Sequence, residues 1–140
     1  MRGNLVTLAV LGAAALGLTV MLAAQTGKRT VRDGVFSATQ AERGARVFAS
    51  ICTNCHEMAE FTASGAYLEE VEGEPLWKTF EFVSTKMPDD DPGSLREDEY
   101  AAVLAYILSV YGLPSGEAEL TVDQESLEAI TIMPPALPGS

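Results

Sequence analysis

Two cysteines and one histidine lie close together in the segment Cys52-Thr53-Asn54-Cys55-His56. Two thiols at this spacing reach the two vinyl groups of one haem, and a histidine directly after them stands below the iron as an axial ligand. The motif therefore predicts one covalently attached haem c, bound through Cys52 and Cys55, with His56 as the proximal ligand of the iron.

Other uses of the two thiols explain less of the motif. A redox dithiol of the thioredoxin type starts a helix that follows a strand, and no strand pattern precedes Cys52. A structural zinc site takes four ligands, usually cysteine or histidine, whereas the chain has two cysteines and one histidine. A disulfide across this short gap is awkward in geometry and leaves His56 without a role. The redox dithiol is the main alternative to haem.

Because His56 is the only histidine, the second axial position of such an iron takes methionine, a weaker side chain, water or nothing. Met87 lies in the turn-forming run Met-Pro-Asp-Asp-Asp-Pro-Gly and is the predicted distal ligand. Packing between a helix and a turn is the alternative role for this side chain. The other methionines lie in the apolar N-terminal segment, in the C-terminal tail or too near His56 to reach the opposite haem face: Met1, Met21, Met133 and Met58.

An apolar segment at residues 5–24 follows Arg2 and is rich in Leu, Ala and Val. A basic start and an apolar stretch are typical of a secretory signal, and about 20 apolar residues also span a bilayer. Residues 1–24 are therefore predicted to be a signal peptide or a membrane anchor. Attachment of haem c requires export in either case, so we expect the haem domain in the bacterial periplasm, soluble or tethered to the cytoplasmic membrane.

The rest of the chain predicts helices and loops, with no convincing strand. Residues 25–36 are polar and basic and are interpreted as a linker. A first helix is expected from Ser37 or Thr39 to about residue 50, because Gln40 and Glu42 stand at capping-box spacing. Residues 57–73 are expected to be mostly loop. A second helix begins near Pro75 and ends at Met87, since a residue before proline avoids helical angles.

The clearest predicted helix covers residues 95–111. Ser94 and Glu97 have the spacing of a capping box, and apolar residues recur every three or four positions. Residues 120–132 add one short helix capped by Asp123, and residues 133–140 are expected to be frayed. We expect the surroundings of the haem to include residues from both long helices: Leu76, Trp77, Phe80, Tyr100, Leu104 and Leu108.

Residues 37–113 resemble class I cytochromes c. The resemblance lies in Gly44 and Phe48 before the cysteine motif, in the run Lys86-Met87-Pro88, and in residues 103–108. It implies an all-α fold of three to four helices around one haem, with Gly44 and Tyr106 where the first and last helices cross. The family usually has a proline whose neighbouring carbonyl holds the histidine ring. No proline occurs in residues 57–74, so the hydrogen-bond partner of His56 stays open.

Parts of residues 87–108 also resemble cytochrome modules that serve PQQ-dependent alcohol-type dehydrogenases. The resemblances imply an electron carrier and not an enzyme, with a dehydrogenase as donor and an oxidase or another cytochrome as acceptor. The alternatives are a five-coordinate haem enzyme or gas sensor, and a cytochrome subunit of a larger membrane redox complex. The domain division is then 1–24 leader, 25–36 linker, 37–113 haem domain and 114–140 a partly disordered extension.

The charge balance restricts the partners. Nine Lys and Arg residues stand against 20 Asp and Glu residues, and nucleic-acid binding needs a basic face. We therefore expect no nucleic-acid partner. Asp89, Asp90 and Asp91 directly follow the predicted iron ligand, which favours a redox partner with a basic or neutral patch.

Overall fold

Helices α1 (Ala38–Ser50) and α4 (Glu97–Val110) cross closely at the centre of the fold. Gly44 lies at the crossing, where a Cβ atom would stand 1.8 Å from the carbonyl oxygen of Ala102. The rings of Phe48 and Tyr106 meet nearby with centroids 5.6 Å apart. The expectation that a small residue lets these two helices approach, with Tyr106 packed beside it, is confirmed.

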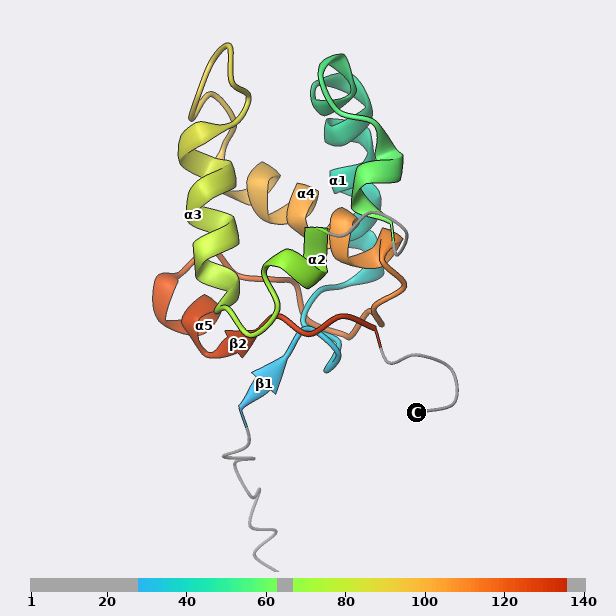
Figure 1. Cartoon of the computed structure of the whole chain (residues 1–140), viewed down its shortest axis with the longest axis vertical. Helices are drawn as coiled ribbons and strands as arrows, with labels where there is room; N and C mark the ends of the chain where they lie inside the picture. Colours follow the sequence, from blue (N-terminus) through green and yellow to red (C-terminus); the bar gives the residue numbers. More distant parts are fainter. Residues whose placement is uncertain (1–27, 63–66, 136–140) are drawn as a thin grey trace, which may run out of the picture.

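The structure is a computed structural model that describes residues 28–62 and 67–135. It is mostly helical, as expected, and α3 stands across from the α1–η2 segment with α4 between them (Figure 1). Besides α1 and α4, the elements are β1 (Arg29–Thr30), the 3-10 helices η1 (Cys52–Asn54) and η2 (Met58–Phe61), α2 (Tyr67–Glu70), α3 (Leu76–Lys86), α5 (Gln124–Glu128) and β2 (Ile130–Thr131).

The helix starts follow side-chain capping at most of the predicted places. The Ser37 hydroxyl accepts a 3.1 Å hydrogen bond from the backbone N–H of Gln40, and the Asp123 carboxylate accepts one of 2.8 Å from Ser126. The predicted start of α4 was two residues early. The N-cap of α4 is Arg96, whose backbone N–H donates to the Glu99 carboxylate at 3.0 Å. Glu97 is one of three acidic residues in that turn, where the helix dipole favours negative charge.

The segment predicted to be a linker is part of the core over its described residues. Val31, Val35 and Phe36 are buried, and β1 pairs in parallel with β2, with Arg29 opposite Ile130. The expectation of no strand was therefore wrong at this point. A strand of two residues has no alternating pattern to detect, and its partner lies near the other end of the chain.

The C-terminal segment, expected to be an extension outside the haem domain, packs against α1 and α3 over its described residues 114–135. The buried side chain of Gln40 donates to the Leu120 carbonyl at 2.9 Å and accepts from the Leu120 N–H at 2.7 Å. Leu127, Ile130 and Ile132 are buried. Met133, expected in a frayed tail, packs against this core.

Among residues 28–62 and 67–135, no helix is long and apolar enough to cross a membrane. The predicted signal peptide or anchor at residues 1–24 lies outside the described residues, as do residues 136–140.

Candidate haem site

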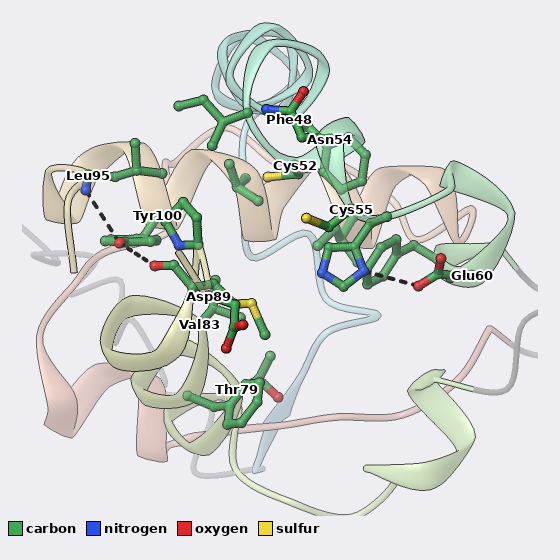
Figure 2. Close-up of a pocket in the computed structure, with 18 of the residues that line it drawn as sticks. Phe48, Cys52, Asn54, Cys55, Glu60, Thr79, Val83, Asp89, Leu95 and Tyr100 are labelled. Atoms are coloured by element: carbon green, nitrogen blue, oxygen red, sulfur yellow. Dashed lines mark hydrogen bonds and ion pairs between the residues drawn. The ribbon is translucent and has the colours of Figure 1, made fainter. Parts of the chain in front are cut away.

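A cavity of about 760 Å³ opens between the cysteine segment and α3, with α4 along one wall. Cys52, Cys55, His56 and Met87 all line it. Figure 2 shows the labelled cysteines on one side of this space and Thr79, Val83 and Asp89 on the other. The four side chains predicted to bind a haem are thus brought to one cavity, although Met87 lies far from the others in sequence.

The tight turn after α1 presents the two thiols. The carbonyl of Cys52 accepts hydrogen bonds from the N–H groups of Cys55, at 3.1 Å, and His56, at 2.9 Å. Thr53 donates its hydroxyl to the carbonyl of Ala49 at 2.9 Å, which ties the turn to the end of α1. Both cysteines are free of disulfide bonds. Burial raises the pKa of the Cys52 thiol, while Cys55 is exposed.

The imidazole of His56 contacts the carboxylate of Glu60, a hydrogen-bond partner that the sequence did not identify. Its Nδ1 lies 3.1 Å from the carboxylate Oε2 of Glu60, and the other oxygen of Glu60 accepts the Glu57 N–H at 2.9 Å. The N–H of Glu57, and secondly the His56 ring, lower the pKa of Glu60. Pro75, the first proline after His56 in the sequence, stands at the N-cap of α3.

Glu60 is therefore a functional candidate that the sequence reasoning missed. Its four-residue separation from His56 was the available signal, because side chains at that spacing meet on one turn of a helix. The pattern was hidden because residues 57–73 showed no period and were interpreted as loop, whereas η2 forms within them.

Helix α4 fixes the segment that carries Met87. Tyr100 is buried in α4, and its hydroxyl donates to the Met87 carbonyl at 2.6 Å. The hydroxyl oxygen of Tyr100 also accepts the N–H of Leu95 at 3.3 Å, as the dashed lines at Tyr100 show (Figure 2). Because Met87 N–H also donates to Val83 at 3.1 Å, the backbone at Met87 is anchored on both sides.

The residues expected to surround the haem were partly wrong. Of the six, only Tyr100 lines the cavity. Leu76, Phe80, Leu104 and Leu108 are buried in the core cluster, and Trp77 packs against it. The apolar face of α3 therefore points at the C-terminal segment as well as at the cavity. The apolar lining comes mainly from other positions: Phe48, Ile51, Phe61, Tyr67, Phe82, Val83, Leu95, Val103 and Ile107.

Polar groups occupy limited parts of the cavity wall. Thr79 is buried and forms a hydrogen bond with Tyr67, whose pKa is nevertheless raised by burial. The phenol of Tyr67 therefore stays protonated at neutral pH. Carboxylates also reach the cavity edge from Glu60, Glu70, Asp89 and Asp90.

The cavity fits a haem in size and chemistry. Cofactor pockets are commonly about 300–1,000 Å³, mostly apolar, with few polar groups at fixed places. Here a pair of thiols, one imidazole and one thioether line the wall of a single apolar space. Thiols form the thioether bonds of haem c, and imidazole and methionine sulfur are known ligands of haem iron.

A mostly helical domain with this motif and this cavity defines a c-type cytochrome. Residues 39–107 match the family model described as "Cytochrome C oxidase, cbb3-type, subunit III". No curated protein and no solved structure matches the chain. The family match supports the same class: the cofactor is one covalently bound haem c, and the protein takes part in haem-based electron transfer as a carrier or subunit, with redox partners.

Proposed function

We propose that the protein is a periplasmic electron carrier whose haem is attached through Cys52 and Cys55 and ligated by His56 and Met87. The convergence of these four side chains on one cavity carries the proposal. Met87 is the decisive member, because nothing in the local cysteine motif requires a distant methionine to line the same space.

The haem supplies one-electron chemistry between Fe(III) and Fe(II) when it is bound. His56 and Met87 would both hold the iron, which would leave no free position for a substrate and would favour outer-sphere electron transfer. The soft sulfur of Met87 raises the reduction potential. The apolar walls, including Phe48, Val103 and Ile107, exclude water and raise it further by disfavouring the extra charge of Fe(III).

The optical spectrum of the reduced holoprotein, with and without carbon monoxide, tests this function. A methionine on the iron leaves no free position, so we expect the spectrum of the wild-type protein to be unchanged by the gas. A shift on addition of carbon monoxide would favour the rival function, a five-coordinate haem enzyme or gas sensor.

The charges at the cavity mouth support a partner with a basic or neutral docking patch. Asp89 and Asp90 line the cavity edge, and both are exposed together with Asp91. Phe82 is 53 % exposed and lines the same cavity. We propose a dehydrogenase as the donor, of the PQQ-dependent type, because parts of residues 87–108 resemble cytochrome modules that serve such enzymes. We propose a respiratory oxidase or another cytochrome as the acceptor.

A second candidate function is that of a cytochrome subunit in a larger membrane redox complex. It is favoured by the description of the matching family, which names a subunit of a cytochrome c oxidase. Fractionation of the native host separates the two functions. A free carrier is found in the periplasmic fraction as a small protein, whereas a subunit stays with the membranes and is extracted by detergent together with other redox proteins. Mass spectrometry of the purified chain shows whether residues 1–24 remain.

A further inference from the structure

The two oxygens of the Glu60 carboxylate have different partners. Oε1 accepts the backbone N–H of Glu57 at 2.9 Å, and Oε2 lies 3.1 Å from Nδ1 of His56. Glu60 belongs to the 3-10 helix η2, which begins two residues after His56. The backbone contact holds the carboxylate in place, so its second oxygen is presented to the imidazole ring (Figure 2).

The contact determines which ring nitrogen serves the iron. A carboxylate accepts hydrogen bonds and cannot donate one, so Nδ1 is the donor in this contact, and in the neutral ring Nε2 then keeps its lone pair. His56 lines the cavity, so Nε2 is the nitrogen available to a metal there. Partners of this kind fix the orientation of a ligating histidine and raise its basicity.

We propose that Glu60 is a positioning residue that orients the His56 ring and lowers the reduction potential of the haem. The inference rests on the proposed role of His56 as an iron ligand. A carboxylate gives a charge-assisted hydrogen bond, which is stronger than the bond to a neutral carbonyl. It pushes electron density towards the ring and stabilises Fe(III) relative to Fe(II).

A plain surface ion pair is the competing interpretation. Glu60 is half exposed and His56 one-third exposed, and exposed pairs contribute little to stability. Such a pair would leave the reduction potential unaffected beyond the loss of one nearby charge. The potential therefore distinguishes the two roles, whereas protein stability does not.

The test compares Glu60→Gln with Glu57→Gln in the full holoprotein. Glu57 lies next to His56 in sequence, so its substitution removes one nearby charge and keeps the ring contact. In Glu60→Gln we expect the ratio of Fe(II) to Fe(III) at a fixed potential to rise about three- to tenfold, where tenfold corresponds to about 59 mV for one electron. In Glu57→Gln we expect a clearly smaller rise.

A second readout follows the iron–histidine bond itself. With Met87→Ala as a common background, we expect Glu60→Gln to lower the iron–imidazole stretching frequency in the resonance Raman spectrum, and Glu57→Gln to leave it unchanged. Equal potentials and equal stretching frequencies in the two glutamine variants would overturn the role of Glu60 while the proposed function stands. A wild-type haem spectrum without histidine ligation would overturn both, whereas one with histidine but no methionine ligation would overturn the proposed function alone.

Discussion

The hydroxyl of Tyr100 donates a 2.6 Å hydrogen bond to the carbonyl oxygen of Met87, across 13 positions of sequence. Tyr100 is almost fully buried, at 3 % exposure, and belongs to α4, which also crosses α1 at Gly44. Helix α4, which packs against α1, thus also holds the backbone of the proposed distal ligand. The position of Met87 relative to the cavity depends on this packing.

Tyr100→Phe should weaken the attachment of Met87 to the iron. The substitution removes one donor to the Met87 carbonyl and the acceptor for the Leu95 N–H, at a cost of about 1 kcal/mol in the free energy of unfolding. We expect the absorption band of the methionine–iron bond to be lost at lower temperature than in the wild type. Tyr111→Phe is the matched control, because its hydroxyl accepts the N–H of Leu68 in α2. Equal loss of the band in both variants would contradict the role of Tyr100.

Met87→Ala should lower the reduction potential and open the iron to carbon monoxide, because water or a vacancy replaces a soft sulfur ligand. Redox titration and the spectrum with carbon monoxide measure the two effects. Met133→Ala is the control, since Met133 packs against the core and does not line the cavity. If Met87→Ala behaves like the control, another group occupies the distal position.

Cys52→Ala and Cys55→Ala should each prevent accumulation of stable holoprotein, because each removes one thioether bond to the cofactor. Acid-acetone extraction followed by absorbance of the protein pellet checks the covalent link in the wild type. Haem that leaves the wild-type chain under this treatment would show that the attachment is not covalent.

Gly44→Ala should destabilise the fold, although the same change in an exposed helix interior stabilises by roughly 0.5–1 kcal/mol. The new methyl group would stand 1.8 Å from the carbonyl oxygen of Ala102, so the two helices must separate, at a cost of about 1–3 kcal/mol or more. Denaturant unfolding of the holoprotein gives the sign. A neutral or stabilising result would mean that α1 and α4 do not cross this closely.

Electron transfer from the donor should depend on salt and on the acidic cavity mouth. Charge steering is screened over a Debye length of about 10 Å at 0.1 M salt. Changing Asp89, Asp90 and Asp91 together to Asn should slow stopped-flow reduction about tenfold at low salt, with little effect at high salt. The control changes Glu125 and Glu128 to Gln in α5, where they are exposed and do not line the cavity. A rate indifferent to salt and to the aspartates would mean that the contact is apolar or that this face is not the docking surface.

The sequence by itself determined what is local. The cysteine motif holds its chemistry within five positions, Cys52 to His56, so no knowledge of the fold was needed to predict a covalent haem. Ser37 and Asp123 cap their helices through residues three positions away, which is also a contact that sequence alone contains. The role of Gly44 at the helix crossing was predicted from the resemblance to class I cytochromes c. The structure shows why a glycine is needed there, because a Cβ atom would collide with the carbonyl of Ala102.

Only the tertiary structure decided which distant groups meet. The spacing of apolar residues shows that α3 has a buried face, but not whether that face borders the cavity or the C-terminal segment. Most of the residues expected around the haem therefore lie in the core and do not line the cavity. Residues 31–36 and 120–132 lack a strong pattern, yet apolar side chains in both ranges are buried, and β1 and β2 pair there across about a hundred positions. Likewise Glu60 reaches His56 only because η2 forms, and Met87 lines the cavity because Tyr100 holds its backbone.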